Sequence, residues 1–249
     1  MRNSIAIKRS CLWGLLGCFY LLGCSKENKQ ELLVAVAASN FPVMQEIARQ
    51  YPHKITLVQG ASGQLYTQIQ QGAPYDVYLP AAESYAERLA QERKSRSTPV
   101  RLSTNRLTGW STSPALWSAL IEGDTTKLQG VSIAMANPRT APFGELAVAY
   151  LKAKGCYHFL EKQLVYGQSI AQVNHYIKSR QVTVAFSSQS SVPQLGSEAL
   201  YTHSCENHFS ISQAVLPLND KIQTKDFVTF LQSSVAQNIF REYGFEVVN

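Results

Sequence analysis

The sequence predicts an α/β fold made of two α/β domains with a ligand cleft between them. Short apolar runs alternate with longer segments in which apolar residues recur at helical spacing. This alternation occurs in two series, which are joined around Asn105 after a polar and basic stretch at residues 91–104. Repeated strand-helix units imply parallel strands with right-handed crossovers. A small ligand is expected in the cleft between two such domains.

In the first series, each strand is a short apolar run and a helix follows within a few residues. The helix at residues 41–50, for example, places Phe41, Met44 and Ile47 on one face. The strands are expected at residues 32–36, 55–58 and 77–79, and the helices at 41–50, 64–71 and 83–91. Residues 91–104 are expected to form a surface connection, because they are polar and basic.

The second series repeats this pattern with further amphipathic helices. Val173, Tyr176 and Ile177 form an apolar stripe that is typical of core packing. The strands are expected at residues 131–136, 164–166 and 182–186, and the helices at 144–153 and 170–177. Near the end of the chain, a strand at 214–216 precedes helices at 224–235 and 237–243, which we expect to return to the first domain.

The N-terminus is typical of an exported protein. Basic residues precede an apolar stretch at residues 11–22 that is short for a membrane span, which indicates a signal peptide. The stretch ends in Leu21-Leu22-Gly23-Cys24, which resembles the bacterial lipobox. We expect residues 1–23 to be removed, Cys24 to be lipidated, and residues 24–30 to tether the protein to a membrane, facing the periplasm or the cell exterior. The alternative is an ordinary signal peptide that is cut nearby.

Removal of the signal peptide changes the charge and the cysteine count. The formal net charge of +6 falls to +3, with 20 basic and 17 acidic residues, so the charge gives no sign of nucleic-acid binding. Three cysteines remain, namely Cys24, Cys156 and Cys205. In an oxidising compartment the last two form an even pair, and the sequence therefore allows a disulfide between them. It does not show that their Cα atoms lie within bonding range.

Polar donors are expected at five junctions between a strand and the next helix. Ser39 and Ser62 each lie where a helix begins, so a hydroxyl and the unpaired first-turn amides point the same way. Such junctions gather at the carboxyl ends of parallel strands. The other three are at residues 136–145, 166–170 and 186–191. Because few charges lie among them, the sequence predicts neutral donors around an oxyanion, although each serine alone is typical of a helix cap.

Motifs along almost the whole mature chain resemble the periplasmic molybdate-binding proteins of ABC transporters. They are Ala37-Ala38-Ser39, Gly60-Ala61-Ser62-Gly63-Gln64-Leu65, Gly72-Ala73-Pro74-x-Asp76, Asn137-Pro138-x-x-Ala141-Pro142-x-Gly144 and Tyr243-Gly244-Phe245. The resemblance implies a type II periplasmic-binding-protein fold with hinge strands near Asn105 and residues 209–213. The first domain is then residues 31–105 and 214–249, and the second is 106–213. It also implies a monomer that binds molybdate or tungstate and delivers it to an ABC transporter permease.

The resemblance further implies the residues that contact the ligand. Ser39 and Ser62 match the two hydroxyl donors of the first domain, and Phe143 and Ile170 fall where the family offers backbone amides. Phe143 replaces a residue that is commonly small. Ser188, in a run of four serines, stands where members of the family often have a tyrosine. The shorter serine hydroxyl would reach the anion only if the loop moves closer or water fills the gap.

An enzyme and a metal site are less well supported. Residues 60–64 come close to a nucleophile elbow, but Gln64 stands where the second glycine is required, so no enzyme is expected. His203, Cys205 and His208 have the spacing of metal ligands, yet no fourth ligand is evident. The anion would be bound without direct ligation of the metal by the protein, and no cofactor is expected.

Other functions stay open within the same fold. The ligand is alternatively sulfate, phosphate or a small organic anion, or the lipoprotein is an interaction module without a role in transport. Phosphate is partly protonated at neutral pH, so its site needs a carboxylate acceptor, such as Asp76 or Glu145 inside the cleft. We expect Asp76 to be structural, because its charge would repel an anion. Selection between molybdate and the smaller sulfate would depend on the size of the cavity.

Overall fold

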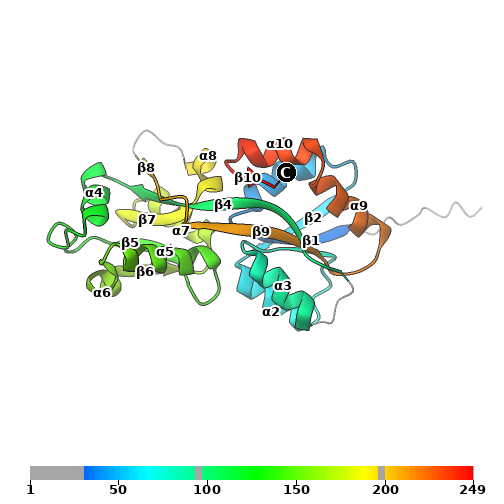
Figure 1. The fold of residues 1–249 in the computed structure, drawn as a ribbon, viewed down its shortest axis with the longest axis horizontal. Helices are drawn as coiled ribbons and strands as arrows, with labels where there is room; N and C mark the ends of the chain where they lie inside the picture. The colour runs from blue at the N-terminus through cyan, green and yellow to red at the C-terminus, as the bar shows by residue number, and fades with distance from the viewer. Residues whose placement is uncertain (1–30, 93–96, 196–199, 249) are drawn as a thin grey trace, which may run out of the picture. The chain divides into compact units, whose positions relative to one another are not determined.

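The computed structural model describes residues 31–92, 97–195 and 200–248, in which strands and helices alternate (Figure 1). The strands are β1 (Leu32–Ala37), β2 (Ile55–Gly60), β3 (Val77–Leu79), β4 (Val100–Ser111), β5 (Ile133–Ala136), β6 (Leu164–Gly167), β7 (Val184–Ser188), β8 (Tyr201–Ser204), β9 (Ser210–Pro217) and β10 (Glu246–Val247). The α-helices are α1 (Phe41–Gln50), α2 (Ser62–Gln70), α3 (Glu83–Glu92), α4 (Pro114–Glu122), α5 (Pro142–Ala153), α6 (Tyr157–Leu160), α7 (Ile170–Lys178), α8 (Val192–Leu195), α9 (Ile222–Leu231) and α10 (Ser234–Glu242). Two 3₁₀ turns are η1 (Glu161–Gln163) and η2 (Gln189–Ser191).

The strands of the described residues join one sheet, in the order β2-β1-β3-β9-β4-β7-β5-β6, with β8 and β10 paired to β4. Strand β1 is parallel to β2 and β3, and β5 is parallel to β6 and β7. These are the strands of the two predicted series, so their parallel pairing is confirmed. Strands β4 and β9 are antiparallel to each other and to β7 and β3, and they connect the two parallel groups.

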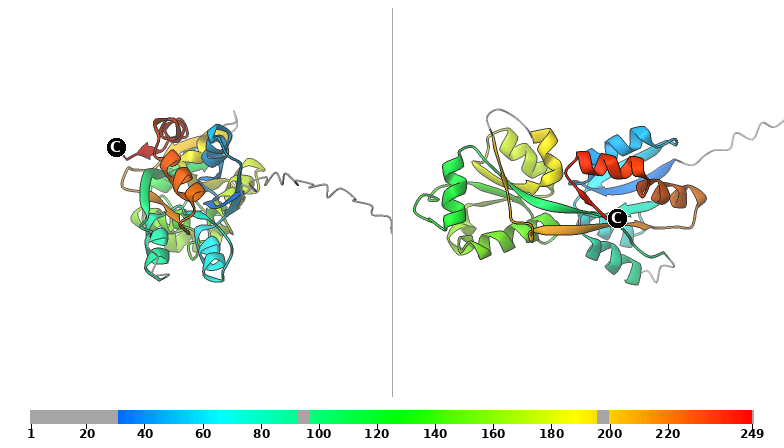
Figure 2. Two further views of the ribbon diagram at one scale, coloured as in Figure 1. Left: turned by 90° about the vertical axis from the view of Figure 1, so that its right-hand side faces the viewer. Right: turned by 45° about the horizontal axis from the view of Figure 1, so that its top comes forward.

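Helices cover both faces of the sheet around β1. Val34 and Val36 pack in a core with α1, α9 and α10, whereas Ala35 points to the other face and packs with α2 and α3. The right-hand view in Figure 2 shows the blue α1 and red α10 on one side of the strands and the cyan α2 and green α3 on the other. The last two helices therefore pack on the same part of the sheet as the first helix.

A second core lies around β5, β6 and β7. Its large buried side chains include the aromatic rings of Trp110, Tyr150 and Phe186, which pack with helices α4, α5 and α7. Close packing in this core leaves no space for a side chain at Gly109 of β4. A Cβ added there would stand 1.9 Å from Trp117 of α4, a distance that real Cβ atoms essentially never show. The missing side chain of Gly109 thus makes room for the indole ring.

The structure differs from the sequence prediction at residues 100–122. The predicted surface connection ends where β4 begins, so that prediction is wrong from Val100 onward. Strand β4 escapes a periodicity search because four of its buried positions are filled by polar residues, which are not core residue types, namely Ser103, Asn105, Thr108 and Ser111. Helix α4 was not predicted. It begins at a proline and ends at Gly123, which has a left-handed conformation with φ of 72°.

Two sequence predictions are not decided by the fold. Strands β4 and β9 run from one core to the other, near the predicted boundaries at Asn105 and Gln213, and the division into two domains stays a prediction. The signal peptide, Cys24 and the tether lie outside the described residues. Among the helices that are described, none has the length and apolar character needed to cross a bilayer.

Candidate functional site

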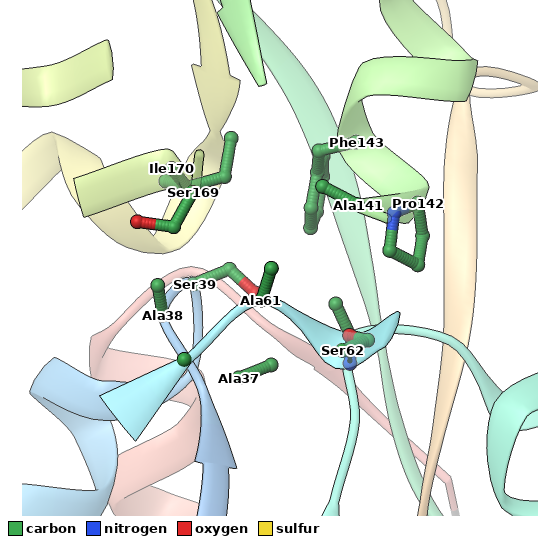
Figure 3. A pocket seen from close by; sticks show the side chains of 12 residues that line it. Ala37, Ala38, Ser39, Ala61, Ser62, Ala141, Pro142, Phe143, Ser169 and Ile170 are labelled. Carbon is green, nitrogen blue, oxygen red and sulfur yellow. Dashed lines mark hydrogen bonds between the residues drawn. The ribbon is translucent and has the colours of Figure 1, made fainter. Parts of the chain in front are cut away.

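A pocket lies at the carboxyl ends of the parallel strands, where four helices begin. It contains about 230 Å³ of empty space, part of which is open to solvent. Figure 3 shows residues from the β1 and β2 junctions on one side of this space and residues that begin α5 and α7 on the other. The lining residues are Ala37, Ala38, Ser39, Gly60, Ala61, Ser62, Ala81, Ala141, Pro142, Phe143, Ser169 and Ile170.

The pocket wall is electrically neutral. None of the twelve lining side chains is ionisable, and five of them are alanine methyl groups. The polar side chains are the hydroxyls of Ser39, Ser62 and Ser169. Four helix N-termini add the partial positive charge of their unpaired amides. Such a wall can donate hydrogen bonds to an anion but offers it no counter-charge.

The Ser62 hydroxyl is held as a donor. Its Oγ accepts a hydrogen bond of 2.9 Å from the Ala81 amide, so its own proton stays free for another acceptor. The Ser62 carbonyl accepts a hydrogen bond of 2.8 Å from the Tyr78 hydroxyl, which is fully buried. Both bonds come from the chain that follows Gly72, and together they fix Ser62 at the first position of α2.

Ser39 is held less tightly through its side chain. Its Oγ lies 3.4 Å from the Asn40 carboxamide oxygen, which is a long hydrogen bond that a better acceptor can replace. Asn40 is itself anchored, because its Nδ2 donates to the Pro80 carbonyl at 3.2 Å. Ser39 therefore lines the pocket with a hydroxyl whose proton can turn toward a ligand.

Backbone amides complete the set of donors. Phe143 is the second residue of α5 and Ile170 is the first residue of α7, so neither amide has an acceptor within its helix. Within the described part of the chain, the amides of Ser39, Ser62, Phe143 and Ile170 donate to no other residue. Gly144 allows the start of α5 to pack against the end of β5, because a Cβ at this position would stand 2.2 Å from the Ala136 carbonyl oxygen. The Phe143 amide precedes Gly144 in the same turn.

Four of the five predicted ligand-binding residues meet at this pocket, and Ser188 does not. Ser39, Ser62, Phe143 and Ile170 line it, as Figure 3 shows. Ser188 is fully buried at the end of β7, and its Oγ lies 2.9 Å from the Ser190 hydroxyl and 3.0 Å from that of Ser191. Contact of any of these residues with a ligand stays a prediction.

Sequence reasoning did not select Ser169 or Ala81. Ser169 precedes the apolar residue that begins α7, which is the signal of a helix cap, and it lines the pocket. Ala81 follows β3 and contributes a methyl group to the wall and an amide to Ser62. An alanine carries no sequence signal for either role.

The two sides of the pocket touch at one backbone contact. The Gly63 amide in the first turn of α2 donates to the Thr140 carbonyl at 2.8 Å, just before α5. A Cβ on Gly63 would lie 3.0 Å from the Thr140 Cα, so the absence of a side chain permits this approach. This contact closes one edge of the pocket.

The two candidate carboxylates lie outside the pocket lining. Asp76 precedes β3 and so lies at the opposite end of the strands, where Leu33, Asn219 and Lys221 each donate to its carboxylate at 2.8 Å. Burial would raise the pKa of Asp76, but these donors hold it below its ordinary value. Asp76 therefore has the predicted structural role. Glu145 is solvent-exposed and does not line the pocket.

Cys156 and Cys205 are core residues, and His203 of β8 is partly buried beside the same core. Cys156 and Cys205 are buried free thiols, so the disulfide that the sequence allowed is absent from the structure. His203 stacks on Trp117 and its Nε2 lies 2.6 Å from the Ser111 hydroxyl, which donates to the Ser113 carbonyl at 2.8 Å. Burial lowers the pKa of His203. No group of three potential metal-binding side chains occurs among the residues that the structure describes.

The α/β sheet and the neutral pocket at its helix N-termini are features expected of a solute-binding protein. The chain belongs to the bacterial extracellular solute-binding protein family, whose model matches residues 32–246. It is 29% identical over 223 residues to the molybdate-binding protein ModA of Rhodobacter capsulatus, which covers 86% of this chain and 88% of the relative. It is 25% identical over 260 residues to the putative ABC transporter substrate-binding lipoprotein YvgL of Bacillus subtilis, covering 96% and 98%.

A solved structure shows the same fold. The periplasmic molybdate-binding protein of Azotobacter vinelandii matches with a TM-score of 0.74 and 21% identity, covering 88% of this chain and all of the other. The predicted type II periplasmic-binding-protein fold is thereby confirmed. The family places the chain among bacterial extracellular solute-binding proteins, and its relatives include proteins named for molybdate binding and for substrate binding with an ABC transporter.

Proposed function

We propose that this protein captures molybdate or tungstate outside the cytoplasm and delivers it to an ABC transporter permease. The neutral pocket carries this proposal, because three serine hydroxyls line it, four unpaired amides belong to its lining residues, and none of its side chains is charged. Hydrogen bonds to a charged partner contribute roughly 1.5–3 kcal/mol each. About five or six of them can outweigh the cost of removing a dianion from water and ordering its site.

The wall of the pocket favours a fully ionised oxyanion. Alanine methyl groups border the space beside the hydroxyls of Ser39 and Ser62, and no side chain of the lining carries a charge. Partly protonated phosphate needs an acceptor, and no carboxylate lines the pocket. The relatives named as molybdate-binding proteins support the same choice.

The mechanism that we propose is binding coupled to closure, without a covalent step. The donors come from both sides of the pocket, so a bound anion favours the form in which the two sides are close. The closed form of a monomer would then present the surface that the permease recognises. Ser188 would contribute only through water or after a movement of the loop that follows β7.

Thermal unfolding of the purified protein tests the ligand. Molybdate, tungstate, sulfate and phosphate are added in turn, each at matched ionic strength. A ligand at about a thousand times its dissociation constant stabilises the native state by roughly 4 kcal/mol, which raises the unfolding midpoint clearly. A rise with molybdate and tungstate alone supports the proposal. A rise with sulfate or phosphate alone, or with none of the four, contradicts it.

We also propose that Cys24 anchors the protein as a lipoprotein. The sequence Leu21-Leu22-Gly23-Cys24 carries this proposal, and the likeness to a protein named as a substrate-binding lipoprotein supports it. The variant Cys24→Ser should move the protein from the membrane fraction to the soluble extracytoplasmic fraction. A variant that stays with the membranes would rule out the lipid anchor at Cys24. Cys205→Ser is the matched control and should remain anchored.

A further inference from the structure

A buried serine outside the pocket holds the backbone of a pocket residue. Ser190 lies in η2, after β7, and its hydroxyl donates to the Ser39 carbonyl at 2.7 Å. The two residues are 151 positions apart in the chain and follow β1 and β7, which belong to different parallel groups of the sheet. Both are almost completely buried, so water does not compete for this bond. Ser190 therefore restrains the residue whose hydroxyl and amide face the pocket.

The same hydroxyl is held by the strand that connects the two cores. Asn105 lies near the middle of β4, and its Nδ2 donates to the Ser190 Oγ at 2.9 Å. The Ser188 hydroxyl lies 2.9 Å from the same oxygen. A serine hydroxyl has one proton and two acceptor positions, and here all three are used. A directed chain of hydrogen bonds thus runs from β4 through Ser190 to Ser39.

This chain joins the connecting strand to the pocket. If β4 bends or twists near Asn105, the Asn105 carboxamide moves and the bond from Ser190 to the Ser39 carbonyl lengthens. Ser39 is otherwise held weakly, because its Oγ bond to Asn40 is 3.4 Å long. Loss of the Ser190 bond would leave the Ser39 amide and hydroxyl free to turn away from a ligand.

We propose that Ser190 is a positioning residue that couples β4 to Ser39 and thereby slows release of the bound anion. The inference rests on the proposed function, since it concerns the same pocket. Ser190 does not line the pocket. Its effect should appear in the dissociation rate, because the bond orders the closed site and not the approach of the anion.

The test compares Ser190→Ala with Ser187→Ala. Ser187 is a matched control because it is also fully buried, at the end of β7 three residues before Ser190. Its hydroxyl donates to Asn174 at 2.6 Å and lies 3.1 Å from the Ser191 hydroxyl, and it does not bond to Ser39. Molybdate dissociation is measured by stopped-flow exchange. Ser190→Ala should release the anion roughly three- to tenfold faster, the equivalent of one hydrogen bond, with an association rate within about twofold of the original. The control should change both rates less than about twofold.

A second readout needs no ligand. Hydrogen exchange at the amides of Ser39, Asn40, Phe41 and Val43 should be faster in ligand-free Ser190→Ala than in Ser187→Ala, because the residues before and at the start of α1 lose the bond from Ser190. Equal dissociation rates and equal exchange in the two variants would overturn the inference and leave the proposed function standing. Faster exchange in a protein that binds none of the four anions would overturn the proposed function and leave the coupling standing.

Two more variants, Ser190→Cys and Asn105→Ala, test the same inference independently of Ser190→Ala. If Ser190→Ala does not fold, Ser190→Cys keeps most of the volume with a weak donor and should show the same change in dissociation rate to a smaller degree. Asn105→Ala should also speed dissociation, and Asn105→Ala combined with Ser190→Ala should add little beyond either change alone. Additive effects of the two changes would contradict a single chain of hydrogen bonds.

Discussion

Ser62 combines a role in the pocket with a role in the fold. Ser62→Ala should weaken oxyanion binding by roughly 1–3 kcal/mol, because one donor to a charged ligand is lost. It should also lower the free energy of unfolding by about 1–2 kcal/mol, since the buried Ala81 amide loses its acceptor. Calorimetric titration and thermal unfolding measure the two effects. Thr67→Ala, on the exposed part of α2, is the control. An unchanged affinity would remove Ser62 from the site.

Substitution of Gly63 should affect the affinity for the anion and the stability of the fold differently. Gly63→Ala places a Cβ 3.0 Å from the Thr140 Cα, so the two sides of the pocket must move apart by a few tenths of an ångström. Within α2, alanine favours the helix by about 1 kcal/mol over glycine. We therefore expect weaker anion binding without loss of stability, measured by titration and by unfolding in denaturant. Weaker binding together with a large loss of stability would show that the substitution disrupts the fold.

The pocket residues that could be predicted from the sequence are those that lie at a junction between an apolar run and a helical pattern. Ser39 and Ser62 follow apolar runs and precede helical spacing, and Phe143 and Ile170 lie where helices begin. Ser188 has the same signal, but its hydroxyl is used within a cluster of serines. The sequence does not reveal which serine of a run points outward, because that depends on the 3₁₀ turn that follows β7.

Asp76 joins β1, β3 and the start of α9 at the end of the sheet away from the pocket. Its pKa is lowered in the folded protein, so the ionised carboxylate stabilises the native state at pH 7. Asp76→Asn should therefore cost roughly 1.5–3 kcal/mol of unfolding free energy at pH 7. The difference should shrink as the pH falls below the ordinary value of 3.8 and through the lower folded-state pKa.

Chemical denaturation at several pH values measures this effect of Asp76. Asp220→Asn is a suitable control, because Asp220 is an exposed acid whose ion pair with Lys225 is 3.4 Å long. Exposed pairs of this kind contribute less than about 1 kcal/mol. A cost for Asp76→Asn that stays constant down to pH 2 would show that the charge is not the stabilising feature.

Elements with strong periodicity could be predicted, and elements with mixed composition could not. Helix α1 and strand β3 have the bounds expected from their apolar residues. Strand β4 is stabilised by neighbours on several sides, and this pairing allows Ser103 and Asn105 to occupy buried positions. Short strands such as β8 depend on β4 for their pairing, so no local pattern marks them.

The whole pocket contains no titratable side chain, which predicts its response to pH. The dissociation constant for molybdate should change less than about twofold between pH 7 and 9, because neither the ligand nor the lining gains or loses a proton there. Calorimetric titration at constant ionic strength measures it, with phosphate, whose own protonation changes in this range, as the comparison. A clear slope for molybdate would show that an ionisable group contacts the anion.

At the scale of the whole chain, the sequence predicted the class of fold and left the arrangement of the cores open. The parallel groups around β1 and β5 follow from repeated strand-helix units. The antiparallel strands β4 and β9 between them join segments that are far apart in the chain, and no local pattern specifies such pairing. The cysteine pair shows the same limit, since only the folded chain shows that both thiols are buried and unbonded to each other.

The two buried thiols, Cys156 and Cys205, can report local opening of the core through their rate of chemical labelling. Burial raises the pKa of Cys156, and burial chiefly raises that of Cys205 to about 12, so neither forms an appreciable thiolate in the native state. Alkylation of these residues therefore requires the surrounding core to open first. Rates of labelling, resolved by peptide mass, would measure the opening of α6 and β8 with and without an anion. Mild reductants should leave the fold unchanged, because the described chain contains no bridge between these residues.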